Sequence, residues 1–258
     1  MDSKDKQELM EEFNRFYAPF TVPGTEIPPR TEEEMTGIDD EQPLLRSLAR
    51  RTDMKRSEDP YIGAKLAGSE ILESLVQVMA KTGKGVHAPT LLAILGACGG
   101  RELCKGILTS LAKMGDGQPA AQLGVYIVGT KSGERYLMGD LAGAQFCNFY
   151  LNAAADGSDP YEVLLPISKK AAETLGTEDY WQTKFNKLIG ADPLQLSKSF
   201  EGNFDKTLAV FTRFPAERML SFAIAVQQAL EQTDKVMDRG EAMKIVAEYG
   251  WRTSHFIG

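Results

Sequence analysis

The stretch that decides the fold is Thr90-Leu-Leu-Ala-Ile-Leu-Gly-Ala-Cys98, in which the eight residues from Leu91 to Cys98 carry no charged or hydroxyl side chain. Pro89 precedes it and favours the start of a helix. A helix that is apolar on every side must be surrounded by other elements, because no face of it tolerates water. A second such stretch, Met219 to Leu230, lies in a helix that we expect to run from Pro215 to about Asp234 as the longest of the chain. The sequence therefore predicts two core helices enclosed by further helices.

One region departs from the helical pattern. Residues 122–128 and 134–138 are rich in Val, Ile, Tyr and Leu, and the glycine-bounded turn 129–133 separates them. This pattern predicts a β-hairpin over about residues 122–139. Because two strands alone are marginal in water, the hairpin must pack on helices or pair with other strands. The predicted fold class is α+β and predominantly α-helical, a compact multi-helix domain with one β-hairpin.

Glycine and proline set the expected helix boundaries. We expect Gly99-Gly100 to end the first core helix, so that residues 101–114 form a separate helix and the two make a helical hairpin. We also expect a helix over 60–81 that is bent or broken near Gly68, and a helix over 161–175 that is kinked or split at Pro166. Further helices are predicted at 141–151, 178–189, 194–200, 206–212 and 241–249.

Four short motifs predict helix starts. Aspartate followed by proline accepts an orphan backbone N–H and presets the first helical φ angle. A threonine with glutamate three residues later has the spacing of a capping box. These motifs are Asp59-Pro60, Asp159-Pro160, Asp192-Pro193 and Thr31 with Glu34.

The N-terminal segment, residues 1–37, reads as an amphipathic helix followed by a proline-rich arm. Its apolar side chains exceed what a solvated spacer requires, so we expect the arm to dock, either on its own chain or on another. The candidate interaction residues are Phe13, Phe16, Tyr17, Phe20 and Ile27. Residues 38–258 are predicted to form a single helical domain with the hairpin at its centre, with a sub-boundary near 156–160 as the alternative.

Charge and hydropathy exclude several classes of partner. The formal net charge is −7, and residues 1–60 hold most of it, so no basic excess is present to neutralise phosphates. Nucleic acid is therefore not an expected partner, and the basic block from Arg46 to Arg56 is expected to be a solvated helix face. An apolar run of eight residues is far short of the roughly 20 that cross a bilayer, and the first residues lack an export signal. We expect no membrane contact and a cytoplasmic location.

Residues with metal or redox chemistry are few. Cys98, Cys104 and Cys147 are an odd number in apolar or helical stretches, which favours packing over disulfides. His87 and His255 are far apart in the sequence, so no zinc site is predicted. The glycines at 83 and 85 lack the spacing of a phosphate loop, and no dinucleotide fingerprint is present. We predict no metal and no cofactor.

One constellation near the hairpin has two interpretations. Arg135 and the start of the helix at Asp140 could attract an anionic ligand, since the free N–H groups of a helix start favour negative charge. Asp140 is itself an anion, however, and a capping role satisfies the same donors without a ligand. We favour the cap and keep Arg135 and Asp140 as candidate pocket residues.

No motif assigns an activity, so two functions are carried forward. The first is a non-catalytic interaction or structural protein that self-associates, or binds another protein, through the N-terminal arm. The alternative is an enzyme or small-ligand binder whose site lies between the hairpin and the adjacent helices, because sites often assemble from residues distant in sequence. Nucleic-acid regulation through the Arg46–Arg56 block is the least favoured hypothesis.

Overall fold

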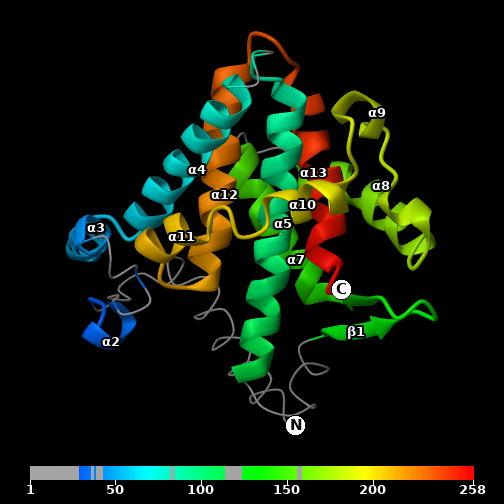
Figure 1. Ribbon diagram of the computed structural model, residues 1–258. Helices are drawn as coiled ribbons and strands as arrows, with labels where there is room; N and C mark the ends of the chain where they lie inside the picture. The colour runs from blue at the N-terminus through cyan, green and yellow to red at the C-terminus, as the bar shows by residue number, and fades with distance from the viewer. Residues whose placement is uncertain are drawn as a thin grey trace.

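The computed structural model of the protein describes residues 29–35, 38, 43–81, 83, 85–113, 124–155 and 159–258. It confirms the predicted fold class, since the described residues are mainly helical with one two-stranded antiparallel hairpin (Figure 1). The elements are α2 (Glu32–Met35), α3 (Pro43–Lys55), α4 (Ile62–Ala80), α5 (Ala88–Lys113), β1 (Tyr126–Gly129), β2 (Arg135–Met138), α7 (Asp140–Ala154), α8 (Pro160–Glu173), η1 (Glu178–Trp181), α9 (Asn186–Ile189), α10 (Pro193–Phe200), α11 (Asp205–Phe211), α12 (Pro215–Thr233) and α13 (Arg239–His255). In this part of the chain, no helix combines the length and the apolar character that crossing a membrane requires.

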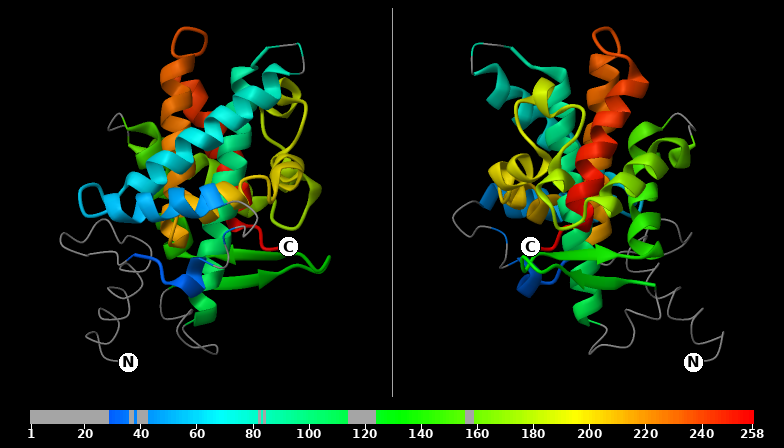
Figure 2. Two further views of the ribbon diagram at one scale, coloured as in Figure 1. Left: turned by 60° about the vertical axis from the view of Figure 1, so that its left-hand side comes forward. Right: turned by 90° about the vertical axis from the view of Figure 1, so that its right-hand side faces the viewer.

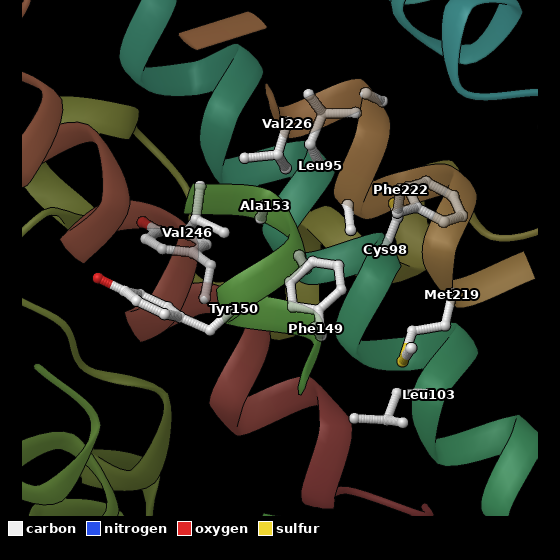
Figure 3. Close-up of a cluster of buried hydrophobic side chains, with 14 of the residues drawn as sticks. Leu95, Cys98, Leu103, Phe149, Tyr150, Ala153, Met219, Phe222, Val226 and Val246 are labelled. Atoms are coloured by element: carbon white, nitrogen blue, oxygen red, sulfur yellow. The ribbon is translucent and has the colours of Figure 1, made fainter. Parts of the chain in front are cut away.

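Helix α5 lies at the centre and contacts α7, α10, α12 and α13 (Figure 1). Every residue from Leu91 to Gly100 is buried, as the all-round apolar pattern predicted. Figure 3 shows how Leu95 and Cys98 of α5 meet Phe222 and Val226 of α12 and Phe149 of α7. The prediction that the two apolar stretches form the core is confirmed.

The predicted helical hairpin at Gly99-Gly100 is wrong, because α5 continues through both glycines to Lys113. It is also the longest described helix, at 26 residues against 19 for α12, which we had expected to be the longest. The physical reason is close packing onto α13. A Cβ atom at Gly100 would clash with the carbonyl oxygen of Gly250, and one at Gly96 would lie 2.7 Å from the carbonyl oxygen of Val246. Glycine serves here for backbone approach and not as a helix stop.

Close packing at glycine also explains why two other helices continue where we expected a break or an end. Helix α4 is unbroken at Gly68, where a Cβ atom would lie 2.7 Å from the carbonyl oxygen of Ser221 in α12. Helix α13 does not end near Tyr249 but continues to His255, with Gly250 facing α5. Of the two forms predicted at Pro166, a kink or a split, the split is wrong, since α8 is continuous across this residue.

The predicted helix 178–189 is two short helices, η1 and α9, separated by an extended segment. The guanidinium group of Arg252 explains this break. Its Nε donates to the carbonyl of Tyr180 at 2.6 Å and its Nη2 to that of Gln182 at 3.2 Å, so these carbonyls face α13.

Three of the four predicted caps are present. Asp159 accepts from the backbone N–H of Tyr161, Asp192 forms a capping box with Gln195, and Thr31 forms one with Glu34. The fourth start falls later than expected. Asp59 accepts from the N–H of Tyr61, and the helix begins at Ile62.

Strand β2 lies between β1 and the end of the chain (Figure 2). Val128 of β1 faces Tyr136 of β2, and on the other edge the N–H of Arg135 donates to the carbonyl of Gly258 at 2.8 Å. The two central residues of β2, Tyr136 and Leu137, point to opposite faces of the strand, and each is fully enclosed. The expectation that the hairpin needs further support is therefore met by residues 256–258 and by helices.

The end of the N-terminal arm docks on its own chain. Arg30 binds the carboxylate of Asp53 through its backbone N–H and its Nη1, both at 3.0 Å, and its Nη2 donates to the carbonyl of Thr212 at 2.7 Å. Burial lowers the pKa of Arg30 even though Asp53 opposes the effect. The candidate residues Phe13, Phe16, Tyr17, Phe20 and Ile27 lie outside the described residues, as do residues 156–158 of the alternative domain boundary.

The prediction that the basic block is a solvated face is wrong for Arg56. Its guanidinium group is buried between the carboxylates of Asp53 and Glu217 and donates to the carbonyl of Phe211 at 2.6 Å. Burial raises the pKa of Glu217, and Arg56 opposes that change. Arg50, in contrast, is exposed and pairs with Glu32 at 2.8 Å. The two opposite charge blocks thus partly neutralise each other within the fold.

Candidate functional site

A surface hollow of about 410 Å³ lies where β2 meets α7, α8 and α13, and we call it the hairpin hollow. Helix α13 contacts α7, α8 and β2, and α7 contacts α8 and β2. This volume falls within the range of roughly 300–1,000 Å³ that is typical of small-ligand sites. The lining residues are Met138, Gly139, Asp140, Leu165, Ser168, Lys169, Ala171, Ala172, Leu175, Tyr180, Trp251 and His255.

One face of α8 forms the largest wall of the hollow. Leu165, Ser168, Lys169 and Ala172 follow the spacing of three, four and seven residues that places side chains on one side of a helix. The turn of the hairpin is held against the end of this helix, since a Cβ atom at Gly176 would lie 2.6 Å from the Thr130 methyl group. The hairpin turn and the segment that follows α8 are therefore in contact.

An aromatic cluster packs beneath the hollow. Tyr180, which also lines the hollow, contacts Tyr136 and Trp181 edge to face, with ring centroids 5.0 and 4.8 Å apart. Phe256 contacts Tyr136 and Trp181 in the same way. The Tyr180 hydroxyl donates to the carbonyl of Arg252 at 3.0 Å, and burial raises its pKa. The floor is therefore a rigid, packed surface with its polar atom already paired.

His255 is the buried titratable residue of the hollow, with only 4% of its surface exposed. Burial lowers the pKa of its imidazole from 6.5 to about 4, so the ring is neutral at pH 7. Its Nδ1 lies 2.9 Å from the carbonyl oxygen of Trp251 and 2.8 Å from the hydroxyl of Ser254. A carbonyl oxygen can only accept, so Nδ1 carries the proton and Nε2 holds a free lone pair.

The two ring nitrogens of His255 therefore differ. Nδ1 is paired within its own helix, and the ring stacks on Trp251 with centroids 4.4 Å apart. Nε2 forms no hydrogen bond with the residues that the structure describes. Nε2 is not one of the enclosed, unsatisfied side-chain atoms of the described residues, so it keeps access to solvent, and His255 is the residue with the most specific chemistry in the lining of the hollow.

Two charged groups flank the hollow. Asp140 is exposed in the first turn of α7, where the helix N-terminus favours a negative charge. The predicted capping role of its side chain is wrong, because the N-cap is Gly139 and no side chain caps this end. Lys169 is exposed on α8, and within the described chain neither charge forms an ion pair. A carboxylate and an ammonium group are thus both available at the site.

The structure places the two predicted pocket residues apart. Asp140 lines the hollow, whereas Arg135 does not. Arg135 and Met138 occupy opposite faces of β2, since successive strand residues alternate. The side chain of Arg135 is exposed on the side away from Met138.

The thiols and the other histidine belong to different environments. Cys98 and Cys104 are free and buried, and burial raises the pKa of these thiols to about 12 and about 11, which leaves them as unreactive packing groups. Cys147 is free and half-buried. His87 is exposed before α5, with Nδ1 2.7 Å from the hydroxyl of Thr90. Among the residues described, no three His, Cys, Asp or Glu side chains gather where they could bind a metal ion.

Comparison with known proteins gives no assignment, since no protein-family model, curated protein or solved structure matches the chain. The site must be interpreted from its own chemistry. Sequence reasoning found Asp140 but missed Lys169, Trp251 and His255. The sequence carries one signal for two of them: Trp251 and His255 are four residues apart and share one helix face once the last helix extends beyond Tyr249, where it was expected to end.

Proposed function

We propose that the protein binds a small, mainly apolar molecule in the hairpin hollow. The observation that carries this proposal is the hollow itself, whose mainly apolar lining includes the buried His255, a residue whose Nε2 has no hydrogen-bond partner among the described residues. Small-molecule sites usually combine apolar walls with a few positioned polar groups that orient the ligand. Asp140 and Lys169, which are exposed and form no ion pair with any described residue, add polar groups at the edge of the same hollow.

Binding fits the hollow better than acid–base catalysis. A general base works best when its pKa lies near the operating pH. Burial holds the pKa of His255 at about 4, so the imidazole is a weak base at pH 7, though it remains a hydrogen-bond acceptor. We therefore favour a ligand-binding role over an enzymatic one.

A blocking substitution tests this proposal. Ala172→Phe places a bulky ring in the hollow from an exposed position on α8, so the fold should tolerate it. Ala144→Phe, at an exposed position of α7 outside the hollow, is the matched control. Binding of 4-ethylphenol and 4-ethylanisole would be followed by calorimetry and by the NMR signal of the Trp251 indole. We expect Ala172→Phe to abolish binding and Ala144→Phe to leave it unchanged; equal affinities in both variants would contradict the proposal.

Self-association is the second candidate function, favoured by an exposed edge strand. Tyr126, Ile127 and Val128 of β1 are 54%, 55% and 39% exposed, and apolar edge strands can pair with another chain. The N-terminal aromatic residues could contribute a further contact. Light scattering of full-length Ile127→Lys and of a Phe16→Ser, Phe20→Ser variant tests this role. A lower mass in either variant supports it, and a monomeric wild-type protein rules it out.

The free cysteines support a reducing, cytoplasmic environment as part of the same proposal. Cys98, Cys104 and Cys147 are all unpaired, and disulfides are rare where thiols are kept reduced. Thiol titration of protein taken directly from cells should find three free thiols under denaturing conditions. A count of one free thiol per chain would indicate that the other two cysteines form a disulfide and would contradict the reducing environment.

A further inference from the structure

We infer that the hairpin hollow selects neutral aromatic molecules that carry a hydrogen-bond donor, as phenols do, and that Nε2 of His255 accepts that donor. This inference rests on the proposed binding function and specifies its ligand class. It assigns His255 as the residue that determines specificity.

The position and protonation of the acceptor are fixed before a ligand arrives. Nδ1–H of His255 is held by the carbonyl of Trp251, and the ring is stacked on the Trp251 indole. These contacts set both the tautomer and the ring plane, as hydrogen bonds at one nitrogen generally do for the other. Nε2 therefore presents a lone pair without rotation or proton transfer.

Burial makes this acceptor selective. With 4% of the residue exposed, Nε2 has little access to bulk water once a ligand covers the hollow. A ligand without a donor would leave it unpaired, which costs more than the hydrogen bond itself contributes. The other polar side chains of the inner wall are committed, since Tyr180 donates to the carbonyl of Arg252 and Ser168 to that of Leu165.

The remaining surface fits an aromatic body. Trp251 offers ring surface, and Met138 and Leu175 add apolar contacts. Aromatic rings pack well against rings and thioethers, and a phenol combines an apolar body with one polar tip. Asp140 and Lys169 flank the hollow with opposite charges, so neither a cation nor an anion is favoured by the net charge.

The test compares two probes that differ at one oxygen, which carries a hydrogen in the phenol and a methyl group in the anisole, so that only the phenol can donate a hydrogen bond. Calorimetry would measure the affinity of 4-ethylphenol and of 4-ethylanisole for the full-length protein. His255→Asn keeps a donor at the position of Nδ1 and removes the acceptor. His87→Asn, at the exposed histidine before α5, is the matched control.

The wild-type protein and His87→Asn should bind the phenol about tenfold more tightly than the anisole. In His255→Asn the two affinities should become equal, with that of the anisole little changed. Equal affinities in the wild-type protein would overturn the inference while leaving the proposed binding function in place. If neither probe binds the wild-type protein, the inferred ligand class and the proposed binding function are both wrong.

Discussion

Helix α13 meets α5 through backbone contacts in its middle, and at its last turn it lines the hairpin hollow with ring side chains. At the first contact Val246 and Gly250 face glycines of α5 so closely that a single methyl group would clash. At the second, Trp251 and His255 border open space of about 410 Å³. One helix therefore belongs to two environments within about two turns.

The two environments differ in how much added or lost volume they tolerate. Backbone-to-backbone contact leaves no side chain that can move aside, so the crossing of α5 and α13 is intolerant of added volume. The hollow is bordered by exposed side chains of α8, which can be replaced without disturbing the core. We expect stability to depend on the crossing and ligand selection to depend on the hollow.

The largest expected effect is at Arg252, which lies between the two environments and is fully buried. It binds carbonyls of Tyr180 and Gln182 and the carboxylate of Glu248. Arg252→Met should lower the free energy of unfolding in urea by about 3–5 kcal/mol, because these groups lose a buried partner. Arg50→Met, which breaks an exposed pair with Glu32, should cost no more than about 1 kcal/mol. Equal losses in the two variants would show that Arg252 does not join the two regions.

Low pH should destabilise the protein through His255, at the end of α13 that lines the hollow. The pKa of His255 is about 4 in the folded protein against an ordinary value of 6.5, so between these pH values the unfolded chain binds more protons. Stability should therefore be complete above pH 6.5, fall by about 3 kcal/mol as the pH drops to 4, and not fall further on this account. Urea unfolding of wild type and His255→Asn across this range isolates the effect, since other titrating groups are common to both. Parallel curves would contradict the assignment.

Added volume at the crossing should be the next effect in size. Gly100→Ala should destabilise the protein by about 2 kcal/mol, because its methyl group meets the carbonyl of Gly250. Gly143→Ala in α7 is the control, where the new Cβ atom would be 3.7 Å from Trp251, an ordinary contact. There alanine should stabilise the helix by about 0.5–1 kcal/mol. If the melting temperatures of Gly100→Ala and Gly143→Ala shifted in the same direction, the distinction between a glycine in close backbone contact and one in ordinary contact would be wrong.

The smallest effect on stability is expected in the wall of the hollow. Leu165 is 65% exposed, so Leu165→Ala should change the free energy of unfolding by no more than about 0.5 kcal/mol. The same change should weaken binding of 4-ethylphenol severalfold, because it removes apolar surface from the wall. Calorimetry on a variant of unchanged melting temperature measures this directly. Unaltered affinity would place the ligand elsewhere.

How far the sequence predicts the fold depends on the kind of contact. The burial of Leu91 to Cys98 was predictable because a helix that is apolar on every side must be buried on every side. The continuation of α5 through Gly99-Gly100 was not predictable. A glycine that ends a helix and a glycine that allows close packing of a neighbouring backbone look identical in the sequence. The partner glycine, Gly250, lies far along the chain.

The site was predictable only where its parts are close in sequence. Asp140 was identified because it follows the hairpin directly, and it does line the hollow. His255 and Lys169 reach the same hollow from distant helices, and a single sequence gives no pairing between such segments. The break after η1 was hidden for the same reason, since Arg252 causes it from α13.

Hydrogen exchange measured residue by residue tests the contrast between the two regions most directly. Amides at the crossing, in Leu91–Gly100 of α5 and Ile245–Gly250 of α13, should exchange only through global unfolding, with the free energy measured in urea. Amides of β1 and of α8 beside the hollow should open locally at lower free energy, and 4-ethylphenol should slow those of α8. If the amides at the crossing exchange as fast as those of β1, the glycine contact between α5 and α13 does not hold the core.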